Sequence, residues 1–88
     1  MMDPFTLTID SLIAPAQNCF AVTPHDTAAL PLVTKSIYVG LGGDLAVLPL
    51  QGEISVIFRN LPDGMILDVR ARAILATGTT ASDIVGLA

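Results

Sequence analysis

The chain has 88 residues, the size of one domain (residues 1–88), and its 8 acidic and 4 basic side chains give a formal net charge of −4 at pH 7. This balance argues against a nucleic-acid-binding protein, because such proteins neutralise phosphates with clustered Lys and Arg side chains. Hydrophobic residues make up 52% of the chain and charged residues only 14%. One small core cannot bury that much apolar surface, so we expect the chain to associate with other protein chains.

Residues 5–9 alternate apolar side chains with threonine, which predicts a β-strand. The apolar members are Phe5, Leu7 and Ile9. Two interpretations stay open for this strand. It is either the first strand of the domain's own sheet, or part of an N-terminal arm within residues 1–18 that lies on a neighbouring chain. The second interpretation makes these three side chains candidate interface residues.

The next two predicted strands cover residues 19–22 and 32–39. A turn at residues 23–27 ends the first of them, since Pro, Asp and Thr are typical turn residues. The second is rich in β-branched side chains. In this strand Lys35 would lie on the same face as the apolar side chains. A bulge or an edge position would explain a charged side chain there. A glycine-rich turn at residues 40–44 follows.

Residues 45–58 predict a hairpin with strands at 45–50 and 53–58 joined by Gln51 and Gly52. Pro49 indicates an edge strand or a strand end, because proline has no amide hydrogen to donate. Residues 60–64 (Asn-Leu-Pro-Asp-Gly) form the next turn.

Residues 65–75 alternate strictly and predict one long, half-buried strand with its charged side chains on one face. Three of the 4 basic residues of the chain fall in or near it, at Arg59, Arg70 and Arg72. Two interpretations of these arginines stay open. The arginines either form an exposed face paired with Asp68 or Glu53, or set the register of an oligomer interface.

Residues 84–88 are an apolar terminal strand, which we expect inside a sheet. No segment shows a helical period over eleven or more residues. Short strands separated by Gly and Pro turns therefore predict an all-β fold, a small antiparallel β-sandwich or barrel of about six to eight short strands.

The apolar runs are interrupted by Pro and charged residues, so we expect no transmembrane segment. The sequence starts without a basic region followed by an apolar core, so we expect no secretory signal. Cys19 is the single cysteine, which excludes an internal disulfide and fits folding in a reducing cytoplasm. We interpret it as a small core residue.

No motif predicts an enzyme, a cofactor site or a metal site. His25 and Asp26 are adjacent in a turn, where such residues close the turn more often than they catalyse. The aspartates at the predicted turns match no calcium-loop spacing and are interpreted as solvated turn residues. They are Asp44, Asp63 and Asp83.

Short motifs run in a shared order along nearly the whole chain. They include Asp3-Pro4-Phe5, residues 20–24 (Phe-Ala-Val-Thr-Pro), residues 33–40 (Val-Thr-Lys-Ser-Ile-Tyr-Val-Gly), residues 58–64 (Phe-Arg-Asn-Leu-Pro-Asp-Gly) and residues 76–85 (Ala-Thr-Gly-Thr-Thr-Ala-Ser-Asp-Ile-Val). In these motifs the chain resembles the spike base proteins of tailed phages and phage-like gene transfer agents. His25 departs from the pattern, which has a small polar residue there.

The resemblance implies a non-enzymatic structural protein of the virion. It would form a homo-oligomer, a pentamer at a fivefold capsid vertex, that links the capsid protein to a spike fibre protein on the capsid surface. The alternative is a carbohydrate-binding module that contacts the host. The sequence supports this alternative poorly, because Tyr38 is the only tyrosine and tryptophan is absent.

Overall fold

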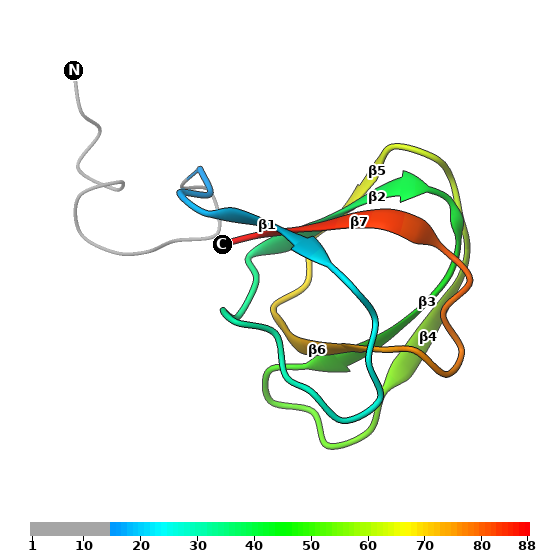
Figure 1. Cartoon of the computed structure of the whole chain (residues 1–88), viewed down its shortest axis with the longest axis horizontal. Coiled ribbons are helices and arrows are strands. Elements are labelled where there is room, and N and C mark those ends of the chain that lie inside the picture. The colour runs from blue at the N-terminus through cyan, green and yellow to red at the C-terminus, as the bar shows by residue number, and fades with distance from the viewer. Residues whose placement is uncertain (1–14) are drawn as a thin grey trace.

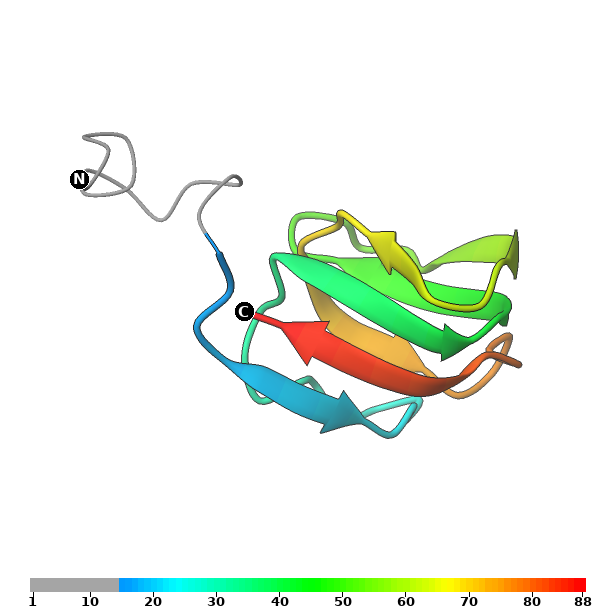
Figure 2. The same ribbon diagram turned by 90° about the horizontal axis from the view of Figure 1, so that it is seen from above.

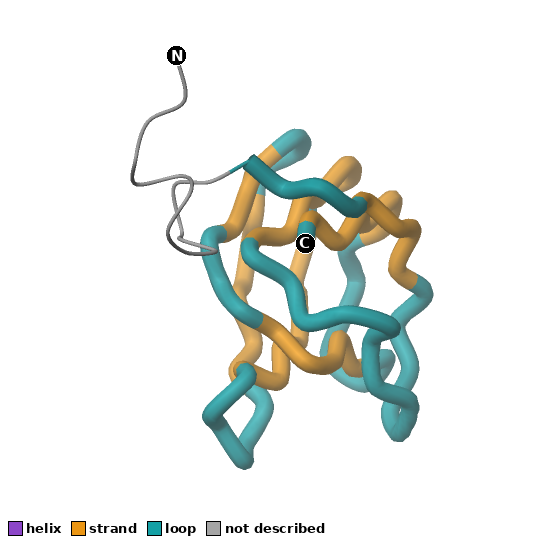
Figure 3. The backbone as a smooth tube through the Cα atoms, turned by 90° about the vertical axis from the view of Figure 1, so that its left-hand side faces the viewer, coloured by secondary structure: helices purple, strands orange, loops and turns teal. Residues whose placement is uncertain are grey.

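The computed structural model describes residues 15–88, which form two β-sheets and no helix (Figures 1 and 3). The strands are β1 (Cys19–Val22), β2 (Ser36–Leu41), β3 (Gly43–Pro49), β4 (Val56–Leu61), β5 (Met65–Leu67), β6 (Ala71–Leu75) and β7 (Ser82–Leu87). The predicted all-β fold is confirmed, and within residues 15–88 no helix could cross a bilayer. The predicted strand at residues 5–9 lies outside the described residues.

All strand pairs are antiparallel, in a four-stranded sheet of order β1-β7-β2-β5 and a three-stranded sheet of order β4-β3-β6. The two sheets face each other as the layers of a sandwich (Figure 1). The last strand, β7, lies between β1 and β2, so the prediction that it belongs inside a sheet is confirmed.

The core lies between the two layers. Ile37 and Val39 of β2 and Leu45 and Val47 of β3 are fully buried and belong to one apolar cluster. Because side chains alternate along a strand, these residues give each sheet its inward face.

The chain passes directly between the sheets at Gly42, the single residue between β2 and β3. A side chain at this position would place its Cβ 2.0 Å from the carbonyl oxygen of Leu61. The Gly42 amide donates to Asp63 Oδ1 at 2.6 Å. The predicted turn at residues 40–44 is thus a sharp corner, and residues 40 and 41 belong to β2.

The prediction of one long strand at residues 65–75 is wrong, because β5 and β6 lie in different sheets and residues 68–70 cross between them. Thr34 holds the crossing. Its buried hydroxyl donates to the Val69 carbonyl at 2.9 Å and accepts from the Ala71 amide at 3.0 Å. The side-chain alternation continues through the crossing, so the pattern carries no sign of the break.

Strand β2 begins at Ser36 rather than at residue 32, and Lys35 precedes it. The parity conflict at Lys35 therefore does not arise, and the suggested edge position is wrong because β2 lies between β7 and β5. The hairpin predicted at residues 45–58 is confirmed as β3 and β4, although residues 50–55 form a longer connection than expected. Pro49 is the last residue of β3, the central strand of its sheet.

Candidate interaction surfaces

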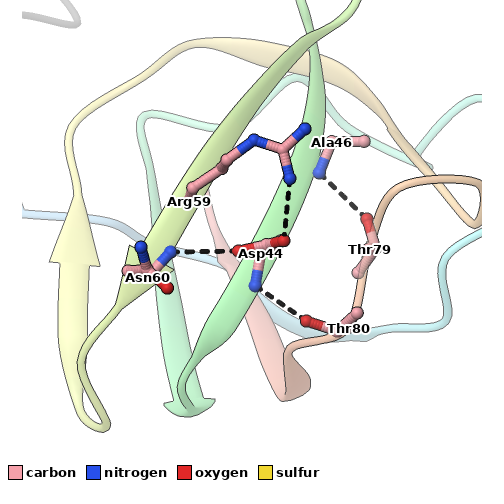
Figure 4. A network of polar contacts seen from close by, with 6 residues as sticks. All are labelled: Asp44, Ala46, Arg59, Asn60, Thr79 and Thr80. Atoms are coloured by element: carbon pink, nitrogen blue, oxygen red, sulfur yellow. Dashed lines mark hydrogen bonds and ion pairs between the residues drawn. The ribbon is translucent and has the colours of Figure 1, made fainter.

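Arg59 lies on a bulge of β4. The register shifts between Gly43 and Leu45, so that Arg59 and Asn60 both oppose Asp44, and Asn60 adopts a φ of 59°. Asp44 Oδ1 accepts from the Asn60 amide at 3.0 Å, and Oδ2 accepts from Arg59 Nη1 at 3.1 Å (Figure 4). The ion-pair partner of Arg59 is therefore Asp44, and neither Asp68 nor Glu53.

The loop at residues 76–81 lies on the other side of Asp44. The hydroxyls of Thr80 and Thr79 accept from the amides of Asp44 and Ala46, each at 2.9 Å (Figure 4). The amides of Thr80 and Ala81 donate to the Asp44 carbonyl at 2.8 and 3.0 Å. Two threonine side chains thus extend the sheet beyond the end of β6. Side-chain pairing of this kind has no periodic signal, so the sequence does not predict it.

Arg72 lies on β6, on the opposite side of β3 from Arg59. Its guanidinium donates to the carbonyls of Pro49 and Gly52 at 3.3 and 2.7 Å, which fastens the connection between β3 and β4. Arg70 is half-buried in the crossing between β5 and β6. The structure therefore does not gather the three arginines at one point, and their part in an interface stays a prediction.

An apolar row crosses the outer face of the four-stranded sheet. The strand registers align Ala21 with Val85, Val85 with Tyr38, and Tyr38 with Ile66. Tyr38 lies between the buried Ile37 and Val39, so its side chain points away from the core. Tyr38 is 38% exposed and Ile66 is 55% exposed. We call these four residues the outer row; they carry no charge.

A second apolar surface lies at the open edge, which we define as Leu50, Ile54, Val56 and Ile57. Val56 pairs with Val47, which is fully buried, and therefore belongs to the inward face of the sheet. Yet Val56 remains 49% exposed, and Ile54 is 79% exposed. The core is thus uncovered where β4 ends the three-stranded sheet.

The side chains of His25 and Asp26 both accept hydrogen bonds from backbone amides. His25 Nδ1 accepts from the amides of Thr27 and Ala28 at 3.1 and 3.0 Å, so the ring closes the turn, as expected. The Asp26 carboxylate accepts from the amide and hydroxyl of Thr77 at 2.7 and 2.8 Å. The hydrogen bond from the Thr77 amide lowers the pKa of Asp26 below its ordinary value of 3.8, and the hydrogen bond from the Thr77 hydroxyl lowers it further.

Cys19 is exposed, so the interpretation as a core residue is wrong. It shares the outward parity of Ala21, and the inward position of β1 beside it is filled by Phe20, whose ring packs over Gly86. Within residues 15–88, no three His, Cys, Asp or Glu side chains come close enough to hold a metal ion. Asp44 lies in β3 and Asp83 in β7, so the interpretation of these two as turn residues is wrong. The carboxylates of Asp44 and Asp63 accept hydrogen bonds from backbone amides.

Two apolar surfaces on a β-sandwich are typical of a protein that associates with other chains. No model of a known protein family matches the sequence, and no curated protein matches it. A solved structure is similar to it, a chain of the "Capsid of native GTA particle computed with C5 symmetry". The two chains are 37% identical, with a TM-score of 0.79, over 99% of this chain and 100% of the other. The chain belongs to the family of this gene transfer agent protein and is a capsid-related protein of phage-like particles.

Proposed function

We propose that this protein is the base of a capsid spike, a homo-pentameric adaptor that joins a fivefold capsid vertex to a spike fibre. The observation that carries the proposal is the match over the full length to a chain of a capsid computed with C5 symmetry. A five-copy ring is the simplest assembly that fits a fivefold axis. The sequence motifs that resemble spike base proteins support the same role.

The two apolar surfaces supply the contacts that such an adaptor needs. A ring subunit must contact two sister copies, the capsid below and the fibre above. The open edge and the outer row lie on different faces of the sandwich, so that one can serve contacts between copies while the other serves a virion partner. The hydrogen bond between Asp44 and Asn60 holds β4 to β3, and the contacts of Arg72 with Pro49 and Gly52 hold the connection between these strands, so that both stabilise the open edge.

No specific observation favours the alternative of carbohydrate binding. Sugar-binding sites use exposed aromatic rings, and the neighbours of Tyr38 on adjacent strands are the aliphatic Val85 and Ile66.

Particles purified from a strain that lacks the gene test the proposal. Electron cryomicroscopy of these particles is expected to show intact capsids without the vertex spikes, and adding the purified protein is expected to restore fivefold density at the vertices. The variant Ile66→Asp, which places a charge in the outer row, serves as a comparison and is expected to restore less density. Spikes that persist without the gene would overturn the proposal.

A further inference from the structure

We propose that the outer edge of β4 receives residues 5–9 of a neighbouring copy as an added strand, so that each subunit of the ring completes the core of the next. This inference rests on the proposed ring. The occupant of the open edge is then a segment of a second copy of this chain.

Among residues 15–88, no strand pairs with the outer edge of β4. Sheet order makes β4 terminal, and its six residues are the longest strand among the edges of the sandwich. The edge of β6 is covered, because the amides of His25 and Leu30 donate to the carbonyls of Ile74 and Arg72. β5 has only three residues. An edge strand with apolar residues, here residues 56–58 before the bulge, is a template for pairing with another extended segment.

Apolar side chains on the inward face of β4 remain partly exposed at this edge. Val56 and Phe58 belong to the inward face of β4, and Val56 is half-exposed although its partner Val47 is buried. A strand added beside β4 with apolar side chains at every second position would shelter Val56 and close the core.

Residues 5–9 have the required pattern. Phe5, Leu7 and Ile9 would face the core beside Val56, and Thr6 and Thr8 would lie on the outer face. The segment is about as long as β4. Threonine on the water-facing side of a strand is favourable, and residues 5–9 hold no proline that would interrupt the pairing.

The position of the segment favours a neighbour over its own chain. It precedes β1, which forms the opposite edge of the sandwich from β4 and β5 (Figure 2). A donor at one edge and an acceptor at the other make a head-to-tail contact between two different surfaces. Such contacts generate closed rings when the rotation between copies permits.

Disulfide mapping in the full-length chain tests the inference. Cys19→Ser removes the native thiol, and Val56→Cys supplies the acceptor. Phe5→Cys, Leu7→Cys or Ile9→Cys is then added singly, because the register is set by whichever residue lies opposite Val56. Thr6→Cys and Thr8→Cys are the matched controls, since they lie on the other face of the same segment.

Mild oxidation is expected to crosslink at least one of the three apolar positions into a ladder of covalent oligomers on a non-reducing denaturing gel, and neither threonine position. Thiol loss without a ladder would mean pairing within one chain and would overturn the inference. Native mass spectrometry of the same variants separates the two proposals. A five-copy species without crosslinks overturns the strand exchange alone, whereas the absence of any oligomer overturns the ring as well.

Discussion

The carboxylate of Asp44 accepts a hydrogen bond from the backbone amide of Asn60 at 3.0 Å, across the bulge that shifts the register between β3 and β4. The bulge leaves this amide without a ladder partner, and the side chain opposite supplies one. The same carboxylate holds Arg59, whose side chain is 66% exposed. The amide contact and the ion pair are thus separable by substitution.

Asp44→Ala is expected to lower the free energy of unfolding by about 1–2 kcal/mol, because the Asn60 amide loses its acceptor. Arg59→Ala removes only the exposed ion pair and is expected to cost less than about 1 kcal/mol. Urea titration followed by circular dichroism measures both values. An equal or larger loss in Arg59→Ala would contradict the assignment of the main contribution to the amide contact.

Thr34→Val is expected to destabilise the fold by about 2–4 kcal/mol, because it leaves the Val69 carbonyl and the Ala71 amide unpaired in a buried crossing. Thr34→Ser keeps the hydroxyl and is expected to cost about 1 kcal/mol for the lost methyl group. Urea midpoints of the two variants give the comparison. If valine is tolerated as well as serine, the hydroxyl does not hold the crossing.

Gly42→Ala is expected to cost more than about 3 kcal/mol or to abolish folding, because the added Cβ would lie 2.0 Å from the Leu61 carbonyl oxygen. Gly64→Ala is the matched control. Gly64 has a φ of 75° but open space around it, so alanine is expected to cost only about 1–2 kcal/mol of backbone strain. Thermal unfolding of both variants ranks them, and the reverse order would contradict the close corner at Gly42.

Acid is expected to weaken the contact between Asp26 and Thr77. The folded-state pKa of Asp26 lies below its ordinary value of 3.8, so the unfolded chain binds the proton first as the pH falls. The contribution is therefore fully present above that value and is lost as the pH falls through the folded-state pKa. Asp26→Asn is expected to be less stable than the wild type at neutral pH and to approach the wild-type stability as the pH falls below 3.8 and through the folded-state pKa. A stability difference that stays constant with pH would contradict this contact.

Apolar alternation and β-branched runs between turn residues predicted most of the strands and the hairpin of β3 and β4. The apolar composition of the last strand predicted the enclosed position of β7. Alternation failed between β5 and β6, where Ala71 continues the parity of Leu67 in a different sheet. A crossing between sheets is decided by a contact distant in sequence, here the hydroxyl of Thr34, and local patterns do not contain it.

The candidate site was predictable only in part. The apolar surplus indicated association, and the exposed Ile66 and Val56 show where apolar surface remains in the described part of the chain. Which apolar residues stay outside depends on the sheet order, which the sequence did not reveal. The arginine pattern indicated one charged strand face. Arg59 instead lies on the bulge of β4 and pairs with Asp44. Bulges have no clear sequence signal, so the sequence did not predict this pairing.

Native mass spectrometry of the full-length protein at micromolar concentration tests the central claim most directly, because it reads association and symmetry together. The account predicts a dominant species of five times the 9.2 kDa chain mass. A single species of 9.2 kDa at every concentration, with no binding to spike-free particles, would contradict it.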